Sequence, residues 1–473
     1  MSTSAPETQL AALDAAIAAQ PGHAELHYHR AALLAQLGRA EDARQAYLAV
    51  LVREPTHFGA LNDLGTLLYA ADFRSAARLV YAEAVRHHPD HPIARINLAN
   101  ALLANDELGE ARLQFEAALR LAPDHPDAHQ GLANLLQHLG DADAAEWHRR
   151  QSYGGRSLLH TPYRGEGDPC QVLVLASAAG GNVPTRFILD PDWFETTTLA
   201  VEAFTPETPL PKHQLVFNAV GDADLSTAAL VAAERVLAHT NAPVINPPAR
   251  VLATDRATNA RRLAGLPGVI APRVEKVPRE DVEALAANIG YPLLVRSPGY
   301  HTGQHFTKVD HPDALAGAVA GLPGRELLLI QYLDARDAHG RSRKYRVMMI
   351  GGVLFPLHLA VSDDWKVHYF TSAMADQPAF RAEEEAFLTD MAGVIGRRGL
   401  SALEAIRDVL GLDYGGVDFG LGADGRVLLF EANATMVVNP PAPDPVWDYR
   451  RAPTLRIIDA ARDLVLARGG GLP

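Results

Sequence analysis

A proline recurs every 34 residues in the first third of the chain, and this period limits the fold more than any other feature of the sequence. The four prolines are Pro21, Pro55, Pro89 and Pro123. Other positions recur in the same phase, with small residues at Ala43, Ala77 and Ala111, aromatic residues at Tyr47, Tyr81 and Phe115, and leucines at Leu34, Leu68 and Leu102. A repeat of this length accommodates one pair of helices, and such pairs bury their apolar faces only by stacking on their neighbours. The sequence therefore predicts an all-α solenoid.

With this length and these positions, residues 8–150 resemble tetratricopeptide repeats, although the usual tryptophan position holds His27, Leu61 and Arg95. The resemblance implies a curved array over residues 1–151 whose concave side receives a peptide or another protein. The candidate contact residues project from the first helix of each pair and are His27, Arg30, Asn62, Asp63, Arg95, Asn97 and Asn134. An array that only mediates self-association, or whose polar side chains are simply solvated, would show the same pattern.

Composition excludes several classes of function. The 473 residues carry a formal net charge of −13, so no basic field draws nucleic acid or an anionic membrane. Cys170 is the only cysteine, which rules out an intramolecular disulfide and fits a reducing compartment. No Lys or Arg precedes Arg30, and no apolar stretch has the length of a membrane span. We therefore expect a cytoplasmic protein with no secretory signal and no transmembrane helix.

Near the other end of the chain, residues 414–433 alternate around Asp424-Gly425, a dipeptide typical of a two-residue hairpin with a type I′ turn. Pairing outward from this turn places Asp418 opposite Glu431. Because side chains alternate across a strand, Asp418, Glu431 and Asn433 are predicted to share one face. The opposite face is predicted to hold Val417, Phe419, Leu421, Leu428 and Phe430.

Two opposed carboxylates repel each other unless a cation lies between them. A hard divalent cation, most often Mg2+, takes oxygen ligands of this kind and holds nucleotide phosphates at its open positions. The hairpin alone is equally typical of a half-exposed sheet with a wet acidic face. The segments that precede it decide between these interpretations.

Residues 152–169 contain glycines and prolines without an apolar period and are predicted to form a linker. Residues 171–181 and 214–220 are apolar runs typical of buried parallel strands, and a helix is predicted at residues 226–239. We therefore expect a small α/β domain over residues 170–251. The turn at residues 179–181 lacks the glycine spacing of a dinucleotide fingerprint, so NAD is not expected.

Six segments then follow in an order that resembles the ATP-grasp superfamily, and glutathione synthetase, D-alanine–D-alanine ligase and RimK-type ligases in particular. They are residues 244–248, 254–264, 291–304, 327–333, 344–352 and 414–433. The resemblance covers about residues 170–470. It implies a multidomain protein in which the solenoid is followed by an α/β pre-ATP-grasp domain at residues 170–251 and an α+β ATP-grasp fold at residues 252–473.

The resemblance also implies a nucleotide site. Arg256 and Arg296 stand where the family usually has phosphate-binding lysines, and arginine's planar fork is not equivalent to lysine's point charge. Residues 297–304, with Gly299 and Gly303, are expected to form a mobile flap over the phosphates. The backbone at Gln331, Tyr332 and Leu333 is expected to bind adenine.

Arg346 matches an arginine that neutralises the transferred phosphoryl group in the family. Asp418, Glu431 and Asn433 match its ligands for Mg2+, with Mn2+ as a substitute. Between them, His358, Lys366 and His368 are candidates to orient a carboxylate or to take a proton from an amine. Ordinary residues of a half-polar sheet are the alternative for these three.

The sequence therefore predicts a ligase that uses ATP and Mg2+ to activate a carboxylate as an acyl phosphate, which an amine or amino acid attacks. The acceptor is expected to be a peptide or protein recruited by the repeats, and an ester product is also compatible with these residues. Two alternatives are a scaffold whose repeats respond to nucleotide and a kinase that phosphorylates its acceptor without ligation.

Overall fold

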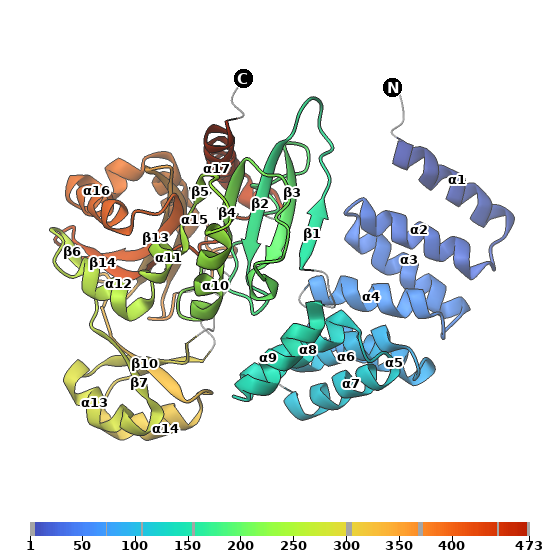
Figure 1. The fold of residues 1–473 in the computed structure, drawn as a ribbon, viewed down its shortest axis with the longest axis horizontal. Helices are drawn as coiled ribbons and strands as arrows, with labels where there is room; N and C mark the ends of the chain where they lie inside the picture. Colours follow the sequence, from blue (N-terminus) through green and yellow to red (C-terminus); the bar gives the residue numbers. More distant parts are fainter. Residues whose placement is uncertain are drawn as a thin grey trace. The chain divides into compact units, whose positions relative to one another are not determined.

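The computed structural model describes residues 5–71, 73–105, 107–153, 157–298, 305–367, 372–441 and 444–470. The chain divides into two compact units, Met1–Gly154 and Gly155–Pro473, which are considered separately below. Figure 1 shows the first unit as helices in blue and teal and the second as a mixture of helices and sheets. Within the described residues, no helix combines the length and the apolar character needed to cross a membrane.

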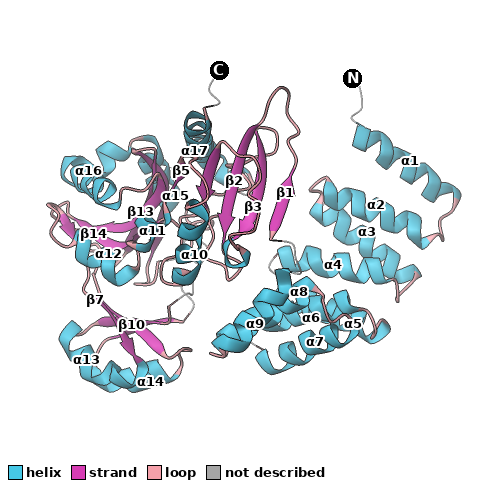
Figure 2. Cartoon of the chain, in the orientation of Figure 1, coloured by secondary structure: helices cyan, strands magenta, loops and turns pink. Residues whose placement is uncertain are grey.

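The first unit consists of helices, as Figure 2 shows. In the described residues they are α1 (Ala5–Ala19), α2 (Ala24–Gln36), α3 (Ala40–Arg53), α4 (Phe58–Ala70), α5 (Arg74–His87), α6 (Pro92–Ala104), α7 (Leu108–Leu121), α8 (Pro126–His138) and α9 (Ala142–Tyr153). Neighbouring helices pack in pairs along the unit, and the in-phase alanines Ala43, Ala77 and Ala111 are fully buried. The predicted helical solenoid is confirmed.

Small residues on the first helix of a pair receive the aromatic ring of a neighbouring helix. A Cβ atom added at Gly65 would lie far inside van der Waals contact with the ring of Tyr81, and one at Gly131 would do the same with Phe115. Tyr81 and Phe115 occupy the recurring aromatic position and are both buried, but Gly65 lies 16 residues before its ring and Gly131 lies 16 residues after its ring, so the aromatic position packs against helices on both sides.

A second feature with the same period was not singled out from the sequence. His23, His57, His91 and His125 each occupy the N-cap position of the first helix of a pair. The Nδ1 atom of His57 accepts a hydrogen bond from the backbone N–H of Ala60, in the manner of a capping side chain.

The second unit begins with a five-stranded sheet of order β1-β3-β2-β4-β5. Its strands are β1 (Leu158–Thr161), β2 (Cys170–Ala176), β3 (Phe194–Ala200), β4 (Leu215–Asn218) and β5 (Val244–Ile245). All neighbours are parallel except β1, which pairs antiparallel with β3. Residues 158–161 lie inside the predicted linker, and a strand of four residues is too short to show a period in the sequence. The helices that follow β4 and β5 are α10 (Thr227–Leu237), α11 (Pro248–Leu252) and α12 (Arg256–Leu263).

A four-stranded antiparallel sheet of order β7-β10-β8-β9 has its own apolar core. It contains β7 (Val274–Pro278), β8 (Leu293–Arg296), β9 (Phe306–Val309) and β10 (Glu326–Gln331), with α13 (Val282–Ile289) and α14 (Leu315–Ala320). Figure 1 shows both helices on one side of this sheet.

The third sheet has the order β12-β11-β13-β14-β6. It contains β6 (Val269–Ile270), β11 (Ser342–Ile350), β12 (Val353–Ser362), β13 (Tyr414–Leu421) and β14 (Val427–Asn433), with α15 (Pro378–Thr389), α16 (Met391–Leu410) and α17 (Arg451–Gly469). The break between α15 and α16 falls between Thr389 and Met391, and α16 has a kink at Gly396, which has a φ of +75°. α17 packs on strands of both the first and the third sheet.

The turn between β13 and β14 corrects the predicted hairpin. Gly425 has a φ of +75°, but Asp424 does not have a positive φ, so the turn is not type I′. The N–H of Gly425 donates to the carbonyl of Gly422, and Gly422 N–H donates to the carbonyl of Arg426. The turn is therefore longer than two residues, and Leu421 lies opposite Val427 instead of Leu428.

A β-bulge further along restores the predicted pairing. Leu429 lies opposite Phe419 and Glu431 opposite Asp418, so Phe430 is the extra residue. Because the register is shifted between the turn and the bulge, Val427 and Leu429 join the core, not Leu428 and Phe430. The opposition of Asp418 and Glu431 was predicted correctly from a turn that was assigned wrongly.

Candidate functional site

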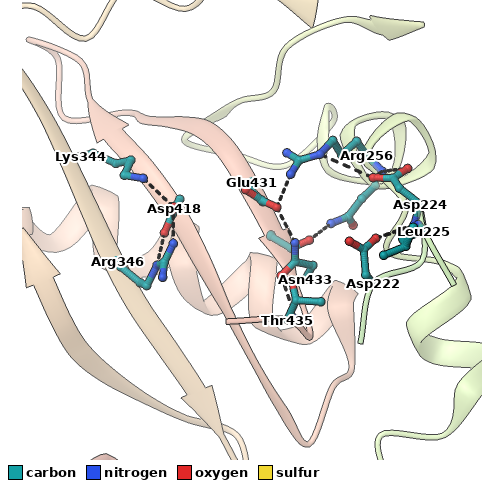
Figure 3. A network of polar contacts seen from close by, with 12 residues as sticks. Asp222, Asp224, Leu225, Arg256, Lys344, Arg346, Asp418, Glu431, Asn433 and Thr435 are labelled. Atoms are coloured by element: carbon teal, nitrogen blue, oxygen red, sulfur yellow. Dashed lines mark hydrogen bonds and ion pairs between the residues drawn. The ribbon is translucent and has the colours of Figure 1, made fainter. Parts of the chain in front are cut away.

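Three neighbouring strands bring the predicted catalytic and metal-binding residues together. Arg346 on β11 lies opposite Asp418 on β13, and Asp418 lies opposite Glu431 on β14. The register shifts directly after Arg346 and directly after Asp418, and the extra residues are Leu357 on β12 and Phe430 on β14, so each of the two side chains lies beside a bulge of the neighbouring strand. Bulges redirect side chains at sites of this kind. Figure 3 shows that the resulting network has two ends, one at Asp418 and one at Glu431.

At the first end, Asp418 is buried and holds two cations. Arg346 binds it through two hydrogen bonds, from Nε to Oδ1 at 2.5 Å and from Nη2 to Oδ2 at 2.8 Å. Lys344 Nζ lies 3.0 Å from Oδ2. Burial alone would raise the pKa of the Asp418 carboxyl, but Arg346 and Lys344 more than offset burial and hold that pKa well below its usual range. Asp418 is therefore a carboxylate at any physiological pH.

His358 on β12 lies opposite Arg346 and is also buried. Burial, reinforced by the nearby Arg346 charge, holds the pKa of the His358 imidazole well below its ordinary value. The ring is neutral at pH 7 and is a weak base.

At the second end, Arg256 at the start of α12 reaches across to Glu431. Arg256 Nη2 lies 2.5 Å from Glu431 Oε1, and Arg256 Nε lies 3.5 Å from Asp224 Oδ2. Asn433 Nδ2 donates to the same Glu431 oxygen at 2.7 Å. Burial opposes ionisation of Glu431, but Arg256 and Arg296 hold its pKa below the usual value. Burial raises the pKa of Asp224 to about 6, although Arg256 acts in the opposite direction.

Arg296 lies at the end of β8 and is nearly buried. Its guanidinium carbon is 5.5 Å from the centre of the Phe306 ring. Burial, together with the charge of Arg256, lowers the pKa of Arg296 to about 10, so the side chain stays charged at neutral pH. Gly299 and Gly303 of the predicted flap lie outside the described residues.

A pocket lies between α12, the β7–β10 edge and β14, with about 380 Å³ of empty space including the part open to solvent. Its lining is apolar at Val274, Ile330 and Leu429 and charged at Arg256 and Glu431. The remaining lining residues are Thr254, Asn259, Ala260, Pro272, Phe430, Ala432 and Asn433. An apolar wall beside a few convergent polar groups is typical of small-molecule sites.

The other predicted residues make their contacts outside the network of Asp418 and Glu431. Gln331 ends β10, where its N–H donates to the Arg273 carbonyl and its Oε1 accepts from the Arg273 N–H. Tyr332 follows directly, with Lys308 Nζ 4.8 Å from the centre of its ring, and Leu333 comes next. Lys366 Nζ donates to the Phe306 carbonyl at 3.4 Å and not to the Asp418 cluster. His368 lies outside the described residues.

The donor set fits a hard divalent cation in its chemistry, because two carboxylates and an amide occupy neighbouring positions of one sheet face. Their oxygens are nevertheless engaged, since Arg346 and Lys344 hold Asp418, Arg256 holds Glu431, and Thr435 donates to Asn433 Oδ1. In the part of the chain that is described, no group of three or more His, Cys, Asp or Glu side chains is arranged to hold a metal. A metal at this set therefore requires the cations to release the carboxylates.

Three residues of the site were not identified from the sequence. Lys344 lies two residues before Arg346 on the same strand, so the period of two could have placed both on one face. Asp224 lies in the segment after β4, at the carboxyl edge of a parallel sheet where ligands commonly bind. Asn259 donates from Nδ2 to the carbonyl of Ala432 on β14, a contact that no local sequence pattern predicts.

The repeat unit brings some of its candidate contact residues together. Asn97 Nδ2 donates to Asn62 Oδ1 at 2.6 Å, and Asn62 Nδ2 donates to Asp63 Oδ1 at 3.0 Å. Tyr28 donates to the other Asp63 oxygen at 2.9 Å. This chain of polar groups joins α2, α4 and α6.

The other candidates have local partners. His27 and Arg95 occupy equivalent positions of their repeats, and each contacts the carbonyl of the proline six residues earlier, Pro21 or Pro89. Arg30 pairs with Asp14 at 2.6 Å, and Asn134 Oδ1 accepts from Gln130. These contacts order the repeat, whereas Asn62, Asp63 and Asn97 form a shared polar surface.

Comparison with known proteins identifies the first unit. Residues 10–57 and 62–126 match the family model of the tetratricopeptide repeat, so this part of the chain is built from tetratricopeptide repeats. Repeats of this class typically bind peptides or other proteins. No curated protein matches the chain.

Three solved structures illustrate the similarity of the repeat region. MamA from Desulfovibrio magneticus RS-1 is 25% identical over 32% of this chain and 86% of that chain, with a TM-score of 0.30. PilF from Pseudomonas aeruginosa is 22% identical over 32% of this chain and 68% of that chain, also with a TM-score of 0.30. YrrB, described as a TPR protein with an unusual peptide-binding site, is 20% identical over 32% of this chain and 77% of that chain, with a TM-score of 0.29.

Proposed function

We propose that this protein is an ATP- and Mg2+-dependent ligase that joins a carboxylate to an amine through an acyl phosphate. The observation that carries the proposal is the register that sets Arg346, Asp418 and Glu431 on three adjacent strands. A pocket with an apolar wall adjoins the Glu431 end of this row. The combination suits a flat base on the apolar side and a chain of phosphates along the charged side.

The cations of the site suit phosphoryl transfer, which depends mainly on positioning and on neutralising charge. Arg256 and Arg296 would hold phosphate oxygens at the pocket. Arg346 and Lys344 would face the phosphoryl group as it moves to the carboxylate substrate. Asp418, Glu431 and Asn433 would bind Mg2+, which supplies charge neutralisation at the transferred phosphate.

Phosphorylation turns a carboxylate oxygen into a good leaving group, so an amine can form an amide with release of ADP and phosphate. The amine must lose a proton during attack. His358 is buried and has a strongly lowered pKa, so the proposal gives it no part in that transfer.

The tetratricopeptide repeats would supply the acceptor. A peptide or protein bound at the polar surface of Asn62, Asp63 and Asn97 would be held on the same chain as the ligase site. Tethering of this kind raises the effective concentration of a substrate group, to the millimolar range for short flexible connections. The co-substrate would be a small amine or an amino acid.

Calorimetric titration with ATP, with and without Mg2+, tests the nucleotide site. We expect saturable binding that needs the metal and is lost in the Asp418→Asn/Glu431→Gln double variant. The double variant Glu404→Gln/Asp408→Asn changes two outward-facing carboxylates on α16 and should bind as the unmodified protein does. Absence of binding at millimolar ATP and Mg2+ would contradict the proposal, provided that circular dichroism shows a folded protein.

A second function is favoured by one observation, namely that arginines at both lysine positions pair with or lie beside the predicted metal ligands. A scaffold could use nucleotide only to alter what the repeats bind. Such a protein would bind ATP tightly and release no ADP with any mixture of amines and peptides, whereas a ligase would release ADP when both substrates are present.

A further inference from the structure

Each carboxylate expected to bind the metal is paired with a cation expected to bind phosphate. Arg256 contacts Glu431 at 2.5 Å, and Arg346 and Lys344 contact Asp418. The side chains of Arg256 and Glu431 are 14% and 22% exposed, so water screens their interaction only weakly. Figure 3 shows the Arg256 guanidinium directed at Glu431 from the other side of the pocket.

The formal charges of the site nearly cancel in this state. Among the described residues, the interacting carboxylates are Asp222, Asp224, Asp255, Asp418 and Glu431, and the interacting cations are Arg256, Arg296, Lys344 and Arg346, which leaves a formal charge of only −1. A divalent cation entering alone would add two positive charges to a buried and nearly neutral cluster. A nucleotide entering alone would bring its phosphates close to carboxylates that have no metal. Either ligand alone is therefore opposed.

We propose that the Arg256 guanidinium occupies the metal position at Glu431 and leaves it only when it binds a nucleotide phosphate. Metal and nucleotide would then bind as a pair. This inference rests on the proposed function and gives Arg256 a role beyond holding phosphate. The exchange conserves the number of ion pairs, since phosphate replaces Glu431 at the guanidinium and metal replaces the guanidinium at Glu431.

Asp224 explains how Arg256 can change partners and stay in place. Its Oδ2 lies 3.5 Å from Arg256 Nε, on the other nitrogen from the one that contacts Glu431. The Asp255 side chain caps α12 by accepting from the Thr258 N–H, which fixes the backbone at Arg256. The guanidinium therefore keeps one carboxylate partner whether its other end faces Glu431 or phosphate.

Lysine could not occupy the metal position equally well. Arginine presents a planar fork that can contact two partners at once, whereas the lysine ammonium is a compact point charge at the end of a shorter side chain. The arginine at position 256, which departs from the family pattern, is thus the feature that couples the two ligands. Coupling between two ligands is reciprocal and commonly amounts to about 5-fold to 150-fold in affinity.

Manganese binding, followed by the electron paramagnetic resonance of free Mn2+, tests the coupling without any turnover. The full-length protein is titrated with Mn2+ in the presence and absence of a non-hydrolysable ATP analogue. We expect the nucleotide-linked Mn2+ site to bind roughly 10-fold or more tightly with the analogue present. The Glu431→Gln variant identifies that site against weak binding by surface histidines.

Removal of the Arg256 guanidinium should change the affinities for the two ligands in opposite directions. Arg256→Met should tighten Mn2+ binding about 10-fold in the absence of nucleotide, weaken the analogue, and reduce the coupling to about 2-fold. Arg256→Lys, which retains the charge, should give intermediate values. Arg261→Met removes an exposed arginine from the same helix and should behave as the unmodified protein does.

The outcomes separate the inference from the proposed function. If Mn2+ and the analogue bind independently, or if Arg256→Met weakens Mn2+ binding in the absence of nucleotide, the inference is overturned and the nucleotide site stands. If neither ligand binds even when both are present at millimolar concentration, the proposed function fails and the inference fails with it.

Discussion

At the scale of single residues, Asp224 is a carboxylate that folding makes harder to ionise. Burial raises its pKa to about 6 although Arg256 lies nearby. The folded state therefore binds a proton more readily than the unfolded state between about pH 4 and pH 6, so the contribution of Asp224 to stability falls as the pH rises through this range.

Asp224→Asn should consequently make the protein as stable as the unmodified chain or more stable at pH 7.5, by up to about 2 kcal/mol, and the difference should vanish near pH 4.5. Urea denaturation at the two pH values measures this. Asp408→Asn, an exposed substitution on α16, serves as the control. A variant less stable than the unmodified protein at pH 7.5 would mean that the pairing of Asp224 with Arg256 outweighs its burial.

The sequence identified many residues of the site but not their partners. Asp418 and Glu431 followed from strand alternation, and Arg256 and Arg346 from the order of motifs. Their pairing with one another depends on the approach of α12 to β14, two elements separated by about 170 residues in the chain. No local pattern encodes such a contact, and the same is true of Asn259 and the Ala432 carbonyl.

At the scale of elements, His91 at the N-cap position of α6 makes the first turn of that helix sensitive to pH. Burial, with His88 nearby, lowers the pKa of His91, which stacks on Phe58 with ring centres 3.9 Å apart. Because the pKa of His91 is lowered in the folded state, the contribution of His91 to stability is fully present above about pH 6.5 and is lost as the pH falls. A protonated cap would also oppose the positive end of the helix dipole, at a cost of roughly 0.3–1 kcal/mol.

We therefore expect amide hydrogen exchange at the start of α6 to accelerate between pH 7.5 and pH 5.5, after correction for intrinsic rates. His91→Asn places a side chain that does not titrate at this N-cap position and should remove most of this acceleration. His29→Asn, at an exposed position of α2, should leave it unchanged. Equal acceleration in His91→Asn would assign the effect to another group.

Gly131 on α8 tests the close packing of a helix against the recurring aromatic position. A Cβ at this position would meet the Phe115 ring, so Gly131→Ala should lower the free energy of unfolding by about 1–3 kcal/mol although alanine favours helices. Gly109 on α7 has nothing within 4 Å of an added Cβ, so Gly109→Ala should be neutral or stabilising by up to about 1 kcal/mol. Urea denaturation distinguishes the two, and similar stabilities would contradict the packing argument.

The hairpin of β13 and β14 shows which part of an element a sequence determines. Alternation requires the polar residues near its open end to share a face, and they do. The conformation of the turn depends on whether Asp424, Gly425 or both adopt a positive φ. The Asp-Gly dipeptide alone does not determine this, and only Gly425 has a positive φ here. The bulge at Phe430 then absorbs the difference of one residue.

At the scale of the whole molecule, the two units differ in how much the sequence reveals. The repeats are stabilised by contacts between near neighbours, so a period along the chain is also a period in space. The sheets of the second unit join strands that are distant in sequence, as when β6 pairs with β14. The sequence predicted the hairpin of β13 and β14 but not the order of the strands in the sheets, and the function of the second unit stays a proposal.

The short strand β1 lies at the junction of the units and at the edge of a sheet, where it pairs along four residues with β3. Without it, β3 would present a row of unpaired N–H and carbonyl groups on which a second copy of the chain could add a strand. A segment expected only to join two units therefore places a strand of four residues at the edge instead of the seven-residue β3, and β1 belongs with the sheet in any attempt to separate the units.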